Sequence, residues 1–429
     1  MIKYGHKIIK PFLPFKQMLR AGGLTFAFRI GGLGLNFLIT LVIIRLYGEA
    51  VFGSYSLVFT IAQASGLLFA LGFPNALISF LGLKPIGHGY SQYLLRKGLK
   101  ILVPLTLIPF LLYYFGAGFI AIHIFNKPEL YNYIVIAAFT VPAMILHEFL
   151  LYFFIATGNN IKFNIFMFGV PNVLLLAMLF FITNVPGHYS FLFYFLSVVV
   201  TLAIEFMVAI KQAGNHTEEK LSSRKMIQFA SPMMFSGMML YLLNWTDVFM
   251  LGSAVSEDEL GHYNLAYKIA SLSMLVIISM NVVLAPRVAA LFKAGNLDEM
   301  HKTVRKTTHI IIALTTPAVL LIIVLSGYLL AFFGDGFTGA RQALIIISIG
   351  FLLNAFAGNV DQILNMTGNQ IILRNITIAG FVLNVLLNIV LIPRYGINGA
   401  ATASLLTNVM VNIACLYYIK KKLGFYTFA

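Results

Sequence analysis

The sequence predicts an all-α integral membrane protein with 12 transmembrane helices, arranged as two parallel six-helix repeats (an N-lobe and a C-lobe) around a central cavity. Three observations predict this fold class. Of the 429 residues, 60% are hydrophobic and only 10% are charged, whereas a soluble protein carries about 25% charged residues. Long apolar runs recur along the whole chain, and two short motifs are repeated at nearly the same separation. The composition therefore excludes a soluble globular protein.

Twelve runs are long and apolar enough to cross a bilayer, which takes about 20 mostly apolar residues. Because a backbone in lipid must satisfy its own hydrogen bonds, we expect each run to be helical. The first run has no small-residue cleavage site after it, so we expect a retained span rather than a signal peptide. The predicted spans are 21–44, 54–81, 99–122, 131–156, 163–184, 189–210, 227–252, 260–286, 307–333, 342–365, 371–393 and 398–419.

The basic residues predict the orientation of these spans, because Lys and Arg collect in cytoplasmic loops. With the N-terminus in the cytoplasm, only four of the 29 Lys and Arg residues fall in outer loops: Arg45, Lys127, Arg341 and Arg394. A wrong span count would scramble this asymmetry. The sequence therefore predicts a multi-pass protein with both termini on the cytoplasmic side.

An internal repeat predicts the two lobes. Glu49 to Leu57 recurs as Glu257 to Leu265, both reading E-x-x-[FL]-G-x-Y-x-L, and Thr157 to Ile161 is echoed by Thr367 to Ile371. Six predicted spans lie between a motif and its echo, so the halves have the same orientation, an arrangement found in transporters. The predicted organisation is an N-terminal lobe (1–210), a cytoplasmic linker (211–226) and a C-terminal lobe (227–429).

Two cations lie deep within predicted spans, where ionisable residues are costly and commonly functional. Arg29 is about 13 Å from the inner edge of the first span, and Lys268 is about 12 Å from the outer edge of the eighth. Cations from both halves near the membrane midplane suggest an aqueous cavity that receives an anion. In the alternative, each is neutralised by a structural partner, Asp247 being the nearest candidate for Lys268.

Titratable residues in the spans are candidates for coupling or gating. Asp247 pairs with Lys268 or binds a coupling cation. Four others lie toward the cytoplasmic end, where they gate the inner side or carry protons: His147, Glu148, Glu205 and Asp361. For Glu205 and Asp361 the alternative is an interfacial charge that reaches the lipid headgroups.

Several function classes have no motif in this chain. There is no His or Cys pairing for a metal, no nucleotide-binding loop and no nucleophile elbow, and one cysteine cannot form an internal disulfide. The net charge of +15 resides in short loops between apolar runs, which is a topology signal rather than a nucleic-acid-binding face. We therefore expect a transporter rather than an enzyme, with no cofactor, no metal and no nucleic acid, driven by an ion gradient, the membrane potential or the substrate gradient rather than by ATP. A membrane-embedded transferase is a remaining alternative, although such enzymes normally carry acidic residues in sizeable loops and this chain has only 14 Asp and Glu residues.

Five stretches carry a family resemblance: 45–55, 245–252, 260–270, 384–388 and 391–401. They resemble the polysaccharide transporter branch, with its O-antigen-type oligosaccharide flippases, of the multidrug/oligosaccharidyl-lipid/polysaccharide (MOP) exporter superfamily. The resemblance covers essentially the whole chain. It marks the superfamily well and the substrate poorly.

The resemblance implies two six-helix lobes in a bacterial inner membrane, with cations of the first and eighth spans holding a diphosphate. Arg29 and Lys268 occupy these spans, and Arg45 matches a common basic residue that is a rim contact or structural. The implied partners are an undecaprenyl-diphosphate-linked oligosaccharide, membrane lipids and polysaccharide polymerase or assembly proteins. Because two further C-terminal spans are absent, a lipid II role is less expected.

The sequence thus predicts a flippase that moves a polyprenyl-diphosphate-linked oligosaccharide to the outer leaflet by alternating access, for polysaccharide or O-antigen biosynthesis. A first alternative is a cation-coupled multidrug antiporter of the same superfamily, in which acids rather than cations dominate the midplane. A second is a non-transporting scaffold of a polysaccharide assembly complex, which has no need of costly midplane cations.

Overall fold

The computed structural model describes residues 15–82, 88–210 and 222–428, and within them every regular element is a helix. The first half contains α1 (Phe15–Tyr47), α2 (Glu49–Phe69), α3 (Phe73–Gly82), α4 (His88–Leu105), α5 (Leu107–Phe119), the π-helical η1 (Ile120–Ile124), α6 (Leu130–Ala156), α7 (Asn160–Asn164), the π-helical η2 (Ile165–Gly169), α8 (Val170–Phe181) and α9 (Tyr189–Ile210). The second half contains α10 (Ser223–Ala254), α11 (Glu257–Ser271), α12 (Met274–Lys293), α13 (Leu297–Val324), α14 (Ser326–Ala331), the 3-10 turn η3 (Asp335–Ala340), α15 (Arg341–Ala357), α16 (Val360–Met366) and α17 (Gln370–Leu423).

Helices or broken helices account for all the predicted spans, and the all-α membrane class is confirmed. Nine of the described helices are long and apolar enough to cross a membrane, or ten if α11 and α12, bent by 51°, form one span. The 54 residues of α17 would extend about 81 Å as a straight helix, far more than a bilayer core of about 30 Å. Its backbone breaks at Gly396 (φ 54°, ψ −131°), between the predicted spans 371–393 and 398–419. The total of twelve remains a prediction.

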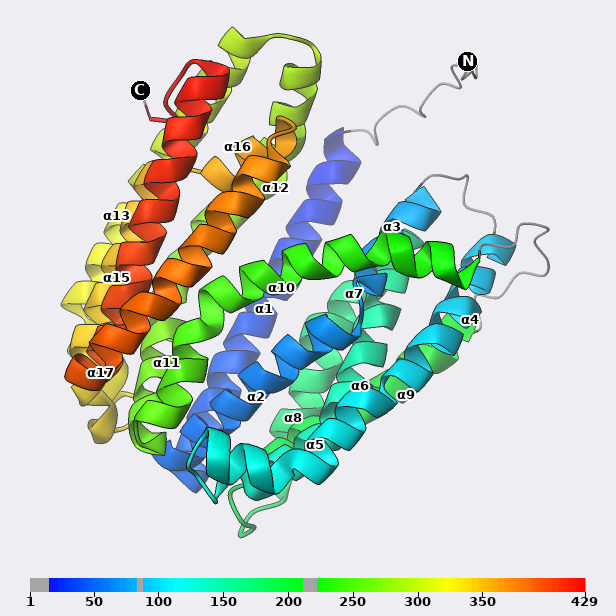
Figure 1. The fold of residues 1–429 in the computed structure, drawn as a ribbon, viewed down its shortest axis with the longest axis vertical. Coiled ribbons are helices and arrows are strands. Elements are labelled where there is room, and N and C mark those ends of the chain that lie inside the picture. The colour runs from blue at the N-terminus through cyan, green and yellow to red at the C-terminus, as the bar shows by residue number, and fades with distance from the viewer. Residues whose placement is uncertain (1–14, 83–87, 211–221, 429) are drawn as a thin grey trace.

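The helices form two groups that meet at one end and diverge at the other (Figure 1). One group holds α4, α5, α6, α8 and α9, and the other holds α12, α13, α15, α16 and α17. We call the splayed end, where α1 begins, the inner end, and the end where the groups meet the outer end, following the predicted orientation. The two groups are thus joined at the outer end and spread apart at the inner end.

The boundary between the groups runs along α10. This helix packs against α17 of the second group and also against α2 and α3 of the first half of the chain. The rings of Phe80 and Phe229, for example, lie 4.9 Å apart. Residues 211–221 of the predicted linker 211–226 lie outside the described residues, and its last four residues already belong to α10. The lobes 1–210 and 227–429 therefore remain a prediction.

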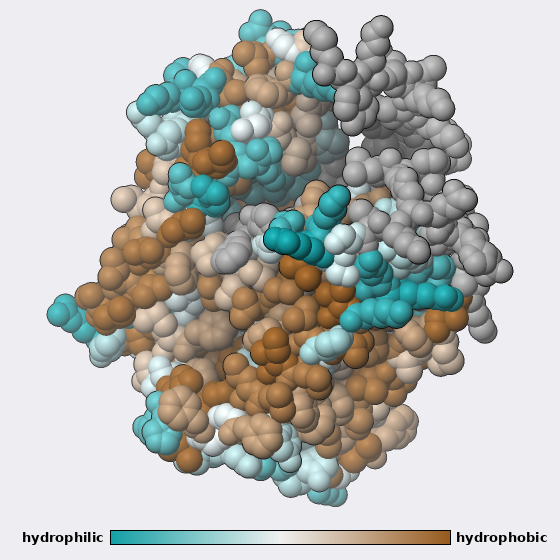
Figure 2. All heavy atoms as spheres, turned by 45° about the vertical axis from the view of Figure 1, so that its right-hand side comes forward, coloured by the Kyte–Doolittle hydropathy of each residue, from teal (hydrophilic) through white to brown (hydrophobic). Residues whose placement is uncertain are grey.

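The molecular surface is that of a membrane protein. Apolar side chains cover most of the lower half of the face shown in Figure 2, whereas strongly hydrophilic residues gather in its upper half and at mid-height on the right, and weaker ones lie along its lower edge. Large side chains such as Phe115 and Phe181 are 78% and 86% exposed. Because water would make such exposure unfavourable, these side chains indicate contact with lipid.

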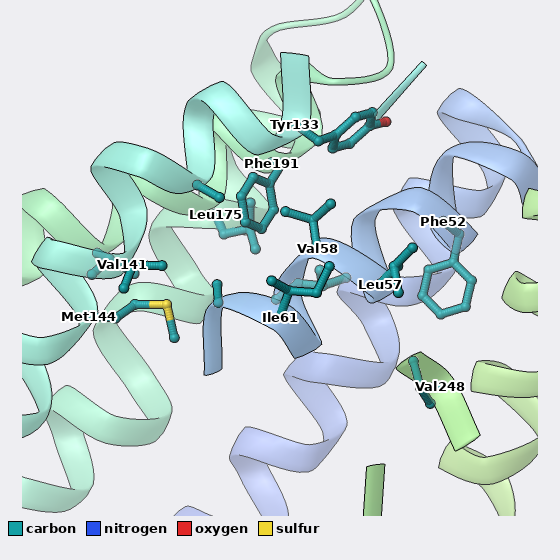
Figure 3. Packing of buried hydrophobic residues seen from close by; sticks show 14 of the residues in the cluster. Phe52, Leu57, Val58, Ile61, Tyr133, Val141, Met144, Leu175, Phe191 and Val248 are labelled. Atoms are coloured by element: carbon teal, nitrogen blue, oxygen red, sulfur yellow. The ribbon is translucent and has the colours of Figure 1, made fainter. Parts of the chain in front are cut away.

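The largest buried cluster joins the two groups. Phe52, Leu57 and Ile61 of α2 pack toward α6 and α9 on one side and toward Val248 of α10 on the other (Figure 3). A second cluster is confined to α12, α13, the last residue of α15, α16, α17 and the residues that follow α17. The second half thus has a core of its own at the inner end, and the groups share apolar packing only where they meet.

Candidate functional site

The repeated sequence motif forms the contact that closes the outer end. Gly53 of α2 and Gly261 of α11, the glycines of the two motif copies, lie where these helices cross. A Cβ atom on Gly53 would overlap with the carbonyl oxygen of Glu257, and one on Gly261 would lie 2.8 Å from the carbonyl oxygen of Glu49. Each glycine therefore packs against the glutamate of the other copy, and only a residue without a side chain fits.

Acid–base pairs flank this crossing. His262 Nε2 lies 2.5 Å from Glu49 Oε2, and Lys127 Nζ lies 3.5 Å from Glu257 Oε1. Both glutamates come from the repeated motif, and each pairs with a residue on the other side of the contact. The sequence analysis did not identify these pairs as functional, although both glutamates belong to the repeated motif and could have been noticed there.

Arg45 also belongs to the outer contact. Its Nη2 donates a hydrogen bond of 3.0 Å to the carbonyl oxygen of Phe332, which follows α14. The side chain thus links the end of α1 to the second group. This position agrees with a structural or rim contact and places the guanidinium at the outer end.

Lys268 connects α11 to α1. Its ammonium donates to the carbonyl oxygen of Asn36 at 3.1 Å and to the Thr40 hydroxyl, and it lies 5.4 Å from the centre of the Phe37 ring. No carboxylate of the described chain lies within ion-pair distance. The alternative in which Asp247 neutralises Lys268 therefore does not hold in this structure.

Arg29 lies on the same helix, α1, closer to the inner end. It is partly buried and makes no hydrogen bond or ion pair within the described ranges. Seven residues separate it from Asn36, which is about 10 Å along a helix. Arg29 and Lys268 are therefore both associated with α1, but they are stacked along it rather than level at one depth as the sequence suggested.

Asp247 belongs to a buried polar chain in the second half. The carboxylate is 1% exposed and accepts hydrogen bonds from the Tyr263 hydroxyl, from Ser404 Oγ at 3.0 Å and from the Val248 amide at 3.2 Å. The chain continues from Ser404 to Asn384 at 3.4 Å and from Asn384 to Asn388 at 3.0 Å.

Part of this polar chain remains unsatisfied. The Asn388 side-chain oxygen has no hydrogen-bond partner. A small pocket beside the chain is lined by Asn244, Tyr263, Ser404 and Asn408 among others. The sequence analysis missed the two asparagines as site residues, although four-residue spacing within an apolar run puts them on one helix face.

The remaining candidates separate into a buried pair and an exposed acid. His147 Nδ1 of α6 lies 2.9 Å from Glu205 Oε2 of α9, and their side chains are 13% and 0% exposed. Glu205 is therefore not an interfacial charge that reaches the lipid headgroups, which was the alternative considered for it. Glu148 follows His147 and is partly buried, whereas Asp361 is exposed at the start of α16 and accepts from Gln362 at 3.1 Å.

These features define a class of protein: a polytopic membrane protein built from two helix groups, with two cations beside α1 that have no carboxylate partner in the described structure. The sequence matches the profile of the polysaccharide biosynthesis protein family over residues 19–292. The chain belongs to this family, which confirms the resemblance found in the sequence. A second profile, MatE, matches residues 232–390.

Individual relatives agree with this placement. The chain is 25% identical over 202 residues to a probable low-salt glycan biosynthesis flippase, Agl15, of Haloferax volcanii, covering 46% of this chain and 42% of the relative. The chain spans less than half the length of the curated relatives it matches.

Solved structures of the MOP superfamily share the fold. An inward-facing multidrug resistance MATE family transporter superposes with a TM-score of 0.74 at 13% identity, covering 91% of this chain and 94% of that one. The lipid II flippase MurJ in an inward closed conformation superposes with a TM-score of 0.73 at 16% identity, covering 94% and 87%. At such identities the likeness establishes the fold alone.

Proposed function

We propose that this protein is a flippase that moves a polyprenyl-linked oligosaccharide across the cytoplasmic membrane by binding its diphosphate. The observation that carries the proposal is the pair of cations along α1, Arg29 and Lys268, neither of which has a carboxylate partner in the described structure. Membership of the polysaccharide biosynthesis family supports this substrate class. Both termini would lie on the cytoplasmic side, as the loop charges predict.

The chemistry of the cations suits a diphosphate. An unpaired charge at membrane depth is costly, and an anionic ligand removes that cost. Hydrogen bonds between ionised groups are shorter and about twice as strong as neutral ones. A carbonyl and a hydroxyl hold the Lys268 ammonium in this structure, and a phosphate would replace them with a stronger partner.

The same exchange would link binding to movement. Lys268 now ties α11 to the outer half of α1. A diphosphate entering from the splayed inner end would draw the ammonium away from Asn36 and Thr40 and so remove one contact that keeps the outer end closed. The halves would then close at the inner end and part at the outer end, while the prenyl tail stays in lipid.

The first test is thermal unfolding of the purified protein with a polyprenyl diphosphate. Wild type should be stabilised by about 2.7 kcal/mol at 100 times the dissociation constant, and Arg29→Ala should abolish most of this shift. Lys293→Ala, which removes an exposed positive charge, should keep it. The matching polyprenyl phosphate should stabilise less, because it carries less charge. Stabilisation by a lipophilic cation alone would instead support a multidrug antiporter.

Asp247 is the proposed binding site of a coupling cation. Carboxylate, hydroxyl and amide oxygens converge there, and oxygen ligands suit hard cations such as Na⁺. No group of three His, Cys, Asp or Glu in the described residues could hold a metal ion, so the site would rest on one carboxylate and neutral oxygens. One carboxylate matches a monovalent cation.

The Asp247→Asn variant tests this role. We expect flipping in vesicles with a Na⁺ gradient to fall at least tenfold and to lose its dependence on the gradient, because an amide cannot neutralise the cation. Stabilisation by the polyprenyl diphosphate should persist. Asp298→Asn, at an exposed site on α13, is the matched control. A variant that responds to Na⁺ as wild type does would refute the assignment.

A further inference from the structure

A buried acid–base pair lies between α6 and α9, two helices that do not carry Arg29 or Lys268. His147 and Glu205 are 58 positions apart in the chain, and their facing atoms, Nδ1 and Oε2, lie 2.9 Å apart. Glu205 is completely buried, and the His147 side chain is 13% exposed. Burying such a pair costs more than it contributes to stability in many proteins, which favours a functional reason for it.

Only one oxygen of the Glu205 carboxyl group is satisfied. Oε2 faces His147, whereas Oε1 is buried and has no hydrogen-bond partner. Buried polar atoms are nearly always hydrogen-bonded, and an ionised carboxylate with an unsatisfied oxygen is especially unfavourable. Binding a proton removes that charge. The geometry therefore provides a reason for this carboxyl group to take up a proton.

The surroundings leave His147 as the nearest acid–base partner. On α6, Glu148 and Tyr152 follow it. The inner end of α4 packs nearby, where Gly98 lies against the Phe149 ring. The other charged or titratable residues of α6 and α9 themselves are Tyr131, Tyr133, Tyr189 and Tyr194. Among the neighbouring helices, α4 contributes Tyr90, Tyr93, Arg96, Lys97 and Lys100, and α7 contributes Lys162. The remaining neighbours contribute Tyr113 and Tyr114 on α5, Glu49 and Tyr55 on α2, and His123 on η1, whereas α3 and α8 contribute none.

The pair is close to the inner end. Glu205 lies five residues before the end of α9, about 8 Å, and His147 lies nine residues before the end of α6, about 14 Å. Gln92 of α4 donates to the Ala209 carbonyl oxygen at 2.8 Å, one turn beyond Glu205. Since His147 is the more exposed member, a proton would reach Glu205 through the imidazole.

We propose that His147 and Glu205 form a proton-binding site through which a proton gradient acts on the transport cycle. His147 takes up a proton at Nε2 and passes the Nδ1 proton to Glu205 Oε2. The imidazole is left neutral with its proton on Nε2, and the carboxyl group is neutral and donates to Nδ1. One proton has entered, and the charge between α6 and α9 has changed by one. The site requires no particular transported substrate.

The first experiment detects the proton directly. Infrared difference spectra of the purified protein, recorded across a pH titration, should contain a carboxyl C=O band that grows as the pH falls and is absent in Glu205→Gln. Glu129→Gln, exposed at the other end of α6, should keep the band. Glu148→Gln should also keep the band. If the band is instead lost in Glu148→Gln and kept in Glu205→Gln, the proton binds to Glu148 and the proposal is overturned. His147→Gln should retain the band and slow its appearance after a pH jump; an unchanged rate would remove the relay role.

The second experiment tests coupling. In vesicles, flipping by wild type should change about tenfold when a gradient of one pH unit is imposed, because one pH unit on one proton is 1.36 kcal/mol. The Glu205→Gln variant should flip the substrate at the same rate with and without the pH gradient. A wild-type rate that ignores the gradient, with the infrared band present, would overturn the coupling claim. The infrared band can be recorded without substrate. If the proposed substrate class is wrong, no flipping of it will be seen in wild type or in any variant, but the band will still be present in wild type.

Discussion

Replacing Gly53 with valine should prevent the outer end from closing. A side chain at this position overlaps with the Glu257 carbonyl oxygen, and backbone of α11 cannot move aside as a flexible side chain can. Overpacking of a tight contact costs about 1–3 kcal/mol. At 1.4 kcal/mol per factor of ten, the ratio of closed to open outer ends should fall by about fivefold to more than a hundredfold.

Disulfide cross-linking across the outer contact measures this ratio. Phe37 and Phe333, whose rings lie 6.4 Å apart, can be replaced together by cysteine and bridged by a short bifunctional thiol reagent where a direct disulfide is out of reach. The Gly53→Val background should slow this cross-linking in proportion to the lost population of closed outer ends. Gly66→Ala is the matched control on the same helix, because a Cβ there meets no atom within 4 Å. Equal cross-linking in both backgrounds would show that this crossing does not close the outer end.

Replacing Lys268 with methionine should raise the stability of the ligand-free protein and abolish transport. A buried charge without a counter-charge is unfavourable, and replacing buried ionic groups by apolar residues of similar volume is often neutral or stabilises by about 1–4 kcal/mol. The same change removes one of the two proposed diphosphate ligands. We expect flipping to fall at least a hundredfold, which corresponds to about 2.8 kcal/mol and lies within the range of a lost hydrogen bond to a charged group.

The opposite signs of these two effects make the test specific. A structural role for Lys268, in which its bonds to α1 matter most, predicts lower stability together with lower transport. Thermal unfolding without ligand and flipping in vesicles should therefore be measured on the same preparations. Arg45→Met is the matched control, since Arg45 is exposed and bonds to a carbonyl oxygen at the outer rim, and its loss should alter transport far less.

The class of the fold follows from composition and periodicity alone. A backbone in lipid has few alternatives to the helix, so apolar runs such as 131–156 and 189–210 locate α6 and α9 to within a residue. The predicted spans 371–393 and 398–419 also separated the two parts of α17 on either side of its break at Gly396. The π-helical segments η1 and η2 were not predicted, because they depend on packing between neighbours, which a hydropathy pattern does not encode.

The candidate site was predictable only in part. Arg29, Lys268, Asp247 and Glu205 stand out as charges in apolar runs, because the membrane makes every such charge costly. Their partners come from distant parts of the chain: Lys268 from α11 meets α1, and His147 from α6 meets Glu205 from α9. No spacing rule links positions 232 or 58 residues apart.

The sequence by itself determined that this chain is a helical membrane protein of the polysaccharide biosynthesis family. The bilayer requires each apolar segment to be helical on its own, and short motifs within single segments carry the family resemblance. Only the tertiary structure decided what the repeat does. Gly53 and Gly261 are ordinary small residues in the sequence, and they become the crossing that closes the outer end because the two halves bring them face to face. Contacts between halves depend on how helices pack, and that is a property of the whole chain rather than of any one segment.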